Sequence, residues 1–169
     1  MKFSVSGITG DSIVDGPGLR LTIFTQGCPH HCEGCHNPQT HDPAGGFWAE
    51  TEDILAVLAE NPLLDGITLS GGEPFLQPVP CRLLAEGAHR LGLSVWAYTG
   101  YTWEALLAEN NADRIALLRE IDVLIDGPFL LAERSLELRF KGSRNQRTID
   151  VKKSLEADTI VLWEEAKYF

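Results

Sequence analysis

The feature that most constrains the fold is an alternation of short apolar runs with helical patterns. Between the runs, apolar residues recur at helical spacing, as at Ile54 and Leu58, with Thr51 and Thr102 as candidate N-caps. The runs are rich in β-branched and aromatic residues and are therefore predicted to be strands, the last being the weakest candidate; they cover residues 19–25, 66–70, 93–98, 122–126 and 159–163. This alternation favours right-handed βαβ units, and so predicts an α/β fold with a mainly parallel sheet.

The length narrows the architecture. The 169 residues suit one domain, spanning 1–169, and are too few for a closed eight-unit barrel, which needs about 250 residues. The sheet is therefore expected to be open or a partial barrel. Unusual residues follow each of the first four predicted strands: Cys28, the Gly71–Glu73 turn, Thr99 and Asp126. Because the carboxyl ends of parallel strands form the functional site, four loops are expected to converge on one pocket.

Charge and composition exclude several classes of protein. The net charge of −10 argues against general nucleic-acid binding, which needs a cationic surface. No stretch approaches the roughly 20 apolar residues of a membrane span, and the first residues lack the apolar core of a signal peptide, so a cytoplasmic location is expected. Three of the four cysteines fall within eight residues. Clustered cysteines in a cytosolic chain indicate metal or redox chemistry rather than a disulfide framework.

The cysteine cluster has the spacing C-x3-C-x2-C, formed by Cys28, Cys32 and Cys35. Thiolates suit iron–sulfur clusters and zinc. A 4Fe–4S cluster is fully ligated by four thiolates, so three would leave one iron open for a small-molecule ligand. The alternative is a zinc site that takes His30, His31 or His36 as fourth ligand. Cys81 begins a helical segment and is expected to be a small buried core residue.

Two further segments carry candidate functional residues. In Ser70-Gly71-Gly72-Glu73-Pro74 the glycines allow close backbone approach to a ligand, and Glu73 could accept hydrogen bonds from an ammonium group. An ordinary strand-to-helix turn is the alternative, and the lysine of a phosphate-binding loop is missing. Residues 15–20 are locally explained as a turn, and the polar residues 142–147 as a solvated loop.

Taken together, these segments resemble a known family. The cysteine motif after one strand and Gly-Gly-Glu after the next resemble the radical S-adenosylmethionine enzymes. The sequence Asp-Gly-Pro-Gly-Leu-Arg at 15–20 is similar to that of the glycyl-radical-enzyme activases. Residues 98–104, 122–129 and 142–147 narrow the resemblance to the activases of anaerobic ribonucleoside-triphosphate reductase, over about residues 3–151. One departure is Gly34, which stands before the third cysteine where many members have an aromatic residue.

The resemblance implies cofactors and a reaction. One 4Fe–4S cluster would be held by the three cysteines, and S-adenosylmethionine would bind its open iron. Reductive cleavage would give a 5′-deoxyadenosyl radical that takes a hydrogen from a glycine of the anaerobic (class III) ribonucleotide reductase. An electron donor such as flavodoxin is implied, and a homodimer is compatible.

The resemblance also assigns residues to roles. Asp126 is expected to bind S-adenosylmethionine or a cation beside it, with a strand-ending turn as the alternative. The residues expected to bind S-adenosylmethionine are Gly34, Cys35, His36, Ser70, Gly71, Gly72, Glu73, Thr99 and Asp126. Those expected to dock the partner are Asp15, Gly16, Pro17, Gly18, Arg20, Gln146 and Arg147.

Three competing functions stay open at this point. The chain also resembles activases of other glycyl radical enzymes, such as pyruvate formate-lyase, although those are longer. A radical S-adenosylmethionine enzyme with a small-molecule substrate, such as 7-carboxy-7-deazaguanine synthase, is the second, against which the Asn-Gln-Arg and Tyr-Thr-Gly-Tyr segments argue. A zinc-stabilised binding module is the third, and it is not an enzyme.

Overall fold

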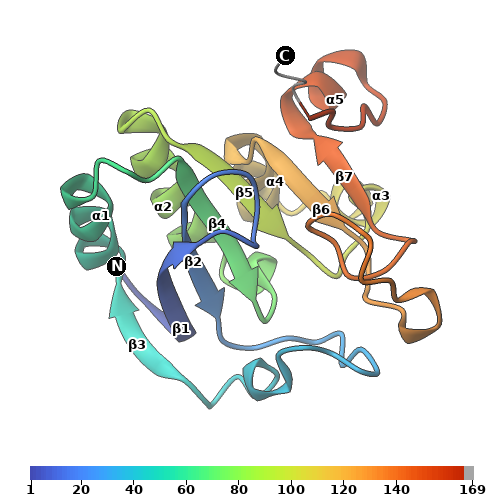
Figure 1. The fold of residues 1–169 in the computed structure, drawn as a ribbon, viewed down its shortest axis with the longest axis horizontal. Coiled ribbons are helices and arrows are strands. Elements are labelled where there is room, and N and C mark those ends of the chain that lie inside the picture. The colour runs from blue at the N-terminus through green and yellow to red at the C-terminus, as the bar shows by residue number, and fades with distance from the viewer. Residues whose placement is uncertain (166–169) are drawn as a thin grey trace.

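A seven-stranded sheet organises the part of the chain that the structure, a computed structural model, describes, which is residues 1–165 (Figure 1). Its strands are β1 (Lys2–Ser12), β2 (Arg20–Thr25), β3 (Phe47–Glu50), β4 (Gly66–Gly71), β5 (Ser94–Tyr98), β6 (Val123–Asp126) and β7 (Arg147–Asp150). They lie in the order β3-β1-β2-β4-β5-β6-β7. The four strands β2, β4, β5 and β6 are parallel, while β1, β3 and β7 add antiparallel at the two sides.

The helices follow the strands along the chain. They are α1 (Thr51–Glu60), α2 (Pro78–Arg90), α3 (Trp103–Glu109), α4 (Ala112–Glu120) and α5 (Val151–Ala157). Figure 1 shows α2 and α4 behind the sheet, with α1 at the left side of the molecule. The predicted N-cap Thr102 is confirmed, because its side chain accepts a hydrogen bond from the Ala105 N–H at 3.1 Å. Thr51 is instead the first residue of α1, where its hydroxyl accepts from the N-terminal ammonium group at 3.1 Å.

The two faces of the sheet have different surroundings. Alternate strand residues such as Ile23, Leu69 and Val95 are wholly buried against the helices in the main core. On the other face, Trp96 packs edge-on against Phe140 and Trp163, with ring centroids 5.3 Å and 4.9 Å away. Aromatic rings therefore cover part of this second face.

The observed architecture confirms part of the prediction. The α/β class and the four central parallel strands are confirmed, as is the complete burial of Cys81. The expectation of a mainly parallel sheet is wrong, because three of the six strand pairings are antiparallel. The sheet as paired is open, with β3 and β7 at its edges, and barrel curvature stays a prediction.

Two further expectations need correction. Residues 159–163 do not form a strand, and only a single bridge joins Leu162 to Ile149. Part of the expected solvated loop at 142–147 is structured, because Arg147 begins β7. Among the described helices, none combines the length and the apolar character that a membrane crossing requires.

Candidate functional site

A pocket of about 640 Å³ opens where the four parallel strands end. Loops after each of these strands contribute to its lining, namely those that carry Cys28, Gly72, Thr99 and Gly127. The predicted convergence of four loops is therefore confirmed. Of the nine residues expected to bind S-adenosylmethionine, six line the pocket: Cys35, His36, Ser70, Gly71, Gly72 and Thr99. Of the expected docking residues, Asp15 and Gln146 line it.

The three cysteines stand together on the loop that leaves β2. The Cys28 N–H donates to His41 O at 3.2 Å, and the Cys35 N–H donates to Cys32 O at 3.1 Å, so backbone bonds shape the loop. All three thiols are free, partly exposed and part of the pocket wall. Burial raises the pKa of the Cys28 thiol, although the His30 N–H bonded to it acts in the opposite direction. The loop thus presents three soft donors to one cavity.

The Gly-Gly turn is explained by the close approach of two backbones. A Cβ on Gly71 would lie 2.5 Å from the Phe24 backbone, and a Cβ on Gly72 would lie 2.3 Å from Gly27 O. Gly71 also has a φ of +91°, which only glycine adopts readily. The Gly72 N–H donates to Thr25 O at 2.8 Å. Both glycines therefore hold the turn against the segment that leads into the cysteine loop, and both also line the pocket.

Glu73 lies behind the pocket wall, fully buried with 0% of its surface exposed. Its Oε1 accepts from the Thr99 hydroxyl at 2.5 Å and from the Gly100 N–H at 3.0 Å, and it lies 2.8 Å from His30 Nε2. One oxygen thus joins the cysteine loop, the Gly-Gly turn and the turn after β5. Three partners therefore already surround this oxygen. The expected contact of Glu73 with an ammonium group stays a prediction.

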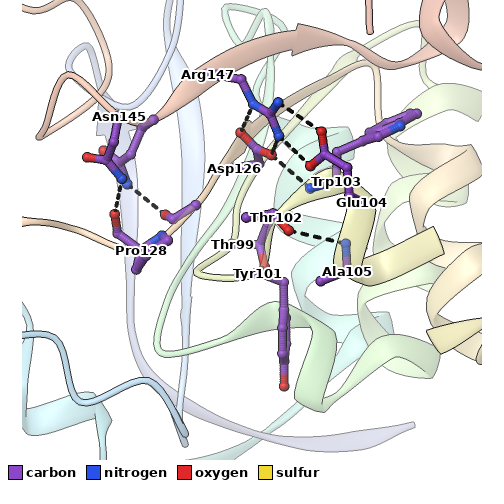
Figure 2. A network of polar contacts seen from close by, with 12 residues as sticks. Thr99, Tyr101, Thr102, Trp103, Glu104, Ala105, Asp126, Pro128, Asn145 and Arg147 are labelled. Atoms are coloured by element: carbon purple, nitrogen blue, oxygen red, sulfur yellow. Dashed lines mark hydrogen bonds and ion pairs between the residues drawn. The ribbon is translucent and has the colours of Figure 1, made fainter. Parts of the chain in front are cut away.

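Asp126 ends β6 and is 1% exposed. Figure 2 shows Arg147 bound to both of its oxygens, with Nε 3.1 Å from Oδ1 and Nη2 2.6 Å from Oδ2. The Trp103 N–H donates to the same Oδ2 at 2.8 Å, and Arg147 reaches on to Glu104 at 2.7 Å. These carboxylates raise the pKa of Arg147, first through its hydrogen bonds to Asp126. The cation that neighbours Asp126 is therefore the protein's own guanidinium.

Asn145, Gln146 and Arg147, here called the Asn-Gln-Arg clasp, act on one stretch of chain. Each side chain binds one of three successive residues at the end of β6. The pairs are Asn145 Nδ2 with Pro128 O at 2.7 Å, Gln146 Nε2 with Gly127 O at 3.1 Å, and Arg147 with the Asp126 carboxylate. The clasp, of which Figure 2 shows Asn145 and Arg147, therefore fixes both ends of the loop 127–146. Residues of this loop line the pocket.

Arg20 is buried as completely, with 0% of its surface exposed. Its guanidinium donates to Thr68 Oγ1 at 2.9 Å, Pro17 O at 3.1 Å and Ile67 O at 2.7 Å, and to Ser94. Desolvation lowers the pKa of Arg20 to about 10, because it outweighs the attraction of the surrounding carboxylates. Arg20 thus pins the 15–18 turn to the sheet, and in this structure it offers no surface to a partner.

Asp15 is held by that turn at the pocket. Its Oδ2 accepts from Ser12 Oγ at 2.5 Å and from Thr22 Oγ1 at 3.1 Å. These two hydrogen bonds hold the Asp15 carboxylate at the lining of the pocket.

The missing aromatic residue before Cys35 has a structural explanation. Gly34 has a φ of +73°, and a Cβ there would lie 2.9 Å from Leu131 and 3.5 Å from the Phe129 ring. The Phe129 ring also lies 5.1 Å from that of His36. An aromatic ring is thus present beside the cysteine loop, supplied by the loop after β6. Sequence reasoning missed it, since no local signal links residue 129 to residue 34.

His41 is a second pocket residue that sequence reasoning missed. It lines the pocket, and its Nε2 is buried without a hydrogen-bond partner among the described residues. A buried polar atom without a partner is costly, so a ligand that fills the pocket would be expected to satisfy it. The orphaned nitrogen and the three thiols together fit an iron–sulfur cluster whose sulfur atoms accept hydrogen bonds. Within residues 1–165, no group of three histidine, cysteine or acidic side chains, the three cysteines included, is gathered closely enough to hold a single metal ion.

Comparisons with known proteins agree with this geometry. Residues 14–149 match the family model described as a 4Fe-4S single cluster domain. Three curated proteins named anaerobic ribonucleoside-triphosphate reductase-activating protein are similar over 79% of this chain. That of Salmonella typhi is 40% identical, with 90% of its length covered, and that of Vibrio cholerae 37%, with 89% covered. That of Escherichia coli K12 is 36% identical, with 90% covered.

The chain belongs to the family of anaerobic ribonucleoside-triphosphate reductase-activating proteins. The matched iron–sulfur domain, residues 14–149, includes the cysteine loop, the Gly-Gly turn and the whole clasp. Among solved structures, that of QueE from Escherichia coli has a TM-score of 0.47 and 21% identity, covering 60% of this chain and 54% of its own, a likeness too distant to carry an argument.

Proposed function

We propose that this protein cleaves S-adenosylmethionine reductively at a 4Fe–4S cluster and installs a glycyl radical on the anaerobic ribonucleotide reductase. Membership of the activating-protein family supports the partner. The observation that carries the chemistry is one pocket that is lined by both the three thiols and the Gly-Gly turn. That pairing offers both a metal site with an open position and exposed backbone for a small cofactor.

Cys28, Cys32 and Cys35 would hold the cluster, and His41 Nε2 would donate a hydrogen bond toward it. When bound, the cluster and S-adenosylmethionine would supply an electron and a 5′-deoxyadenosyl radical that removes a hydrogen from the partner's glycine. An external reductant such as flavodoxin would provide the electron. Every other task falls to residues that bind, orient and exclude water.

The remaining roles follow from position. Ser70, Gly71, Gly72 and Thr99 line the pocket next to the cysteine loop, so we assign them to S-adenosylmethionine. His36 would act from the cysteine loop itself, beside the Phe129 ring.

Buried charges support this wall from behind. Glu73 holds the three loops in register through its shared oxygen, and Asp126 does the same for the turn before α3. These two carboxylates would therefore position the loops that bind the cofactor, without contacting the cofactor themselves.

The test uses protein purified without oxygen. Iron and sulfide would be quantified, and reductant, S-adenosylmethionine and the reductase would be added for electron paramagnetic resonance. The expected result is about four irons and four sulfides per chain, 5′-deoxyadenosine and methionine as products, and a glycyl doublet on the reductase. A colourless protein that contains only zinc would instead establish the zinc-stabilised module.

Two competing enzymatic functions would give different outcomes in the same assay. Cleavage of S-adenosylmethionine with a glycyl signal on pyruvate formate-lyase, and none on the reductase, would reassign the partner. Cleavage with no glycyl signal on either protein, under conditions that reduce the cluster, would favour a small-molecule substrate such as that of a 7-carboxy-7-deazaguanine synthase.

A further inference from the structure

We propose that residues 130–144, here called the arm, dock an acidic and partly apolar segment of the protein that carries the target glycine. The inference rests on the proposed function and adds to it the surface that receives the partner. The arm is the outer part of the loop 127–146 that the Asn-Gln-Arg clasp holds.

The arm exposes apolar side chains. Leu130 and Leu131 are 42% and 43% exposed, and Leu136 is 88% exposed, the highest value among the exposed large hydrophobic residues described. Single exposed leucines are ordinary, but several on one short segment beside a functional pocket mark an interaction surface.

The arm also has a charge opposite to that of the whole molecule. It contains Arg134, Arg139, Lys141 and Arg144 against two glutamates, a net charge of +2 in a chain of −10. Arg134 and Arg144 are exposed. A positive surface on an otherwise acidic protein attracts an acidic segment of a partner.

The arm lies at the pocket that a protein substrate would have to enter. Leu138, Phe140 and Lys141 belong both to the arm and to the pocket lining, and exposed Ile13 and Val14 lie on the 13–19 loop, of which Val14 also lines the pocket. A glycine has no side chain to insert, so the partner's backbone itself must enter. Extended chain advances about 3.3–3.6 Å per residue, so the residues flanking the glycine would cross the rim within a few positions.

The arm is already ordered without a partner. The Arg144 N–H donates to Glu133 O at 2.9 Å, and the Leu130 N–H donates to Ser143 Oγ at 3.2 Å. A bridge pairs Arg134 with Ser143. Its exposed leucines therefore need little ordering on binding, which lowers the entropic cost of docking.

The experiment measures binding and chemistry separately. The arm variants are Leu136→Asp and Arg134→Glu, neither of which lines the pocket. Their matched controls are Leu63→Asp, at 74% exposure, and Arg119→Glu in the last turn of α4, both near the amino ends of the parallel strands. Affinity for the reductase is measured by interferometry, and cleavage of S-adenosylmethionine with dithionite is measured without the reductase.

We expect each arm variant to lose at least about tenfold in affinity, to cleave S-adenosylmethionine like wild type, and to differ from its control in affinity alone. Arg134→Glu should also weaken the dependence of affinity on salt. Wild-type affinity in both arm variants overturns the docking surface, as does an equal loss in the controls. Loss of cleavage together with affinity overturns it too, because the arm would then act on the pocket. A wild type that binds the reductase but cleaves nothing refutes the proposed function instead.

Discussion

Replacing Arg147 by alanine should destabilise the protein strongly, because it strands the Asp126 carboxylate. Asp126 is 1% exposed and would keep only the Trp103 N–H, at 2.8 Å. Removing one partner of a buried ion pair costs about 3–5 kcal/mol, and the lower end applies here because Arg147 is itself 34% exposed. A loss of about 3 kcal/mol corresponds to a fall in Tm of about 6–12 °C for a chain of this size.

The same arginine also binds Glu104, and that contact should contribute far less. Glu104 is 62% exposed, and exposed ion pairs contribute less than about 1 kcal/mol. Thermal and urea unfolding of apo Glu104→Gln would therefore fall close to wild type. The double variant Arg147→Ala with Asp126→Asn should recover part of the loss, because an amide is less costly to bury than a charge.

Two outcomes would refute this reasoning. One is an Arg147→Ala protein within about 1 kcal/mol of wild type, well below the loss expected for a stranded buried charge. The other is a double variant no more stable than Arg147→Ala, which would show that the stranded charge is not the cause.

Three further predictions test other parts of the frame. Gly100→Ala would place a Cβ 2.3 Å from the His30 ring, so we expect overpacking to cost about 1–3 kcal/mol and the variant to retain less iron per chain. The control Gly10→Ala adds a Cβ with nothing within 4 Å and should retain iron like wild type. For Asp122, burial is outweighed by hydrogen bonds from a histidine, a backbone N–H and a lysine, so its pKa is lowered. Apo Asp122→Asn should therefore lose about 1–2 kcal/mol of unfolding free energy at pH 7. In unfolding curves this difference from wild type should shrink once the pH falls below about 3.9, the pKa of an unfolded aspartate, and vanish below the lower pKa of folded Asp122. His41→Phe removes a donor and should make the cluster potential more negative in a redox titration, and an unchanged potential would mean that Nε2 does not reach the cluster.

The sequence predicted those parts of the fold whose signals are local. Strands β4, β5 and β6 carry continuous apolar runs because both faces are covered, and they were found nearly to the residue. Strand β1 was missed because only Phe3 and Val5 are buried in its first half. Strand β7 was missed because its sequence, Arg-Thr-Ile-Asp, is as polar as a loop. Strands with few buried residues, such as β1 inside the sheet and β7 at its edge, leave a weak pattern in the sequence.

The prediction of the site succeeded where its signals are local, and it failed where the position of a side chain depends on distant residues. The cysteine and glycine motifs are short and reach the pocket through backbone geometry that the motifs themselves specify. By contrast, whether an arginine points outward or inward depends on partners far along the chain. Arg20 binds Thr68 and Ser94, and Arg147 binds Asp126, so both side chains point inward although the family resemblance suggested a docking role for them.

The way the cysteine loop is fastened bears on recovery after contact with oxygen. Its base is held by the hydrogen bond from the Gly27 N–H to Thr40 O at 2.7 Å, and its middle by the contact of His30 Nε2 with Glu73 Oε1 at 2.8 Å. Both contacts join protein atoms and do not involve the cluster. Oxidative loss of iron would leave these bonds in place. A damaged molecule would then keep the conformation of its cluster-binding loop. Cellular iron–sulfur repair would rebuild the cluster there without first refolding the chain.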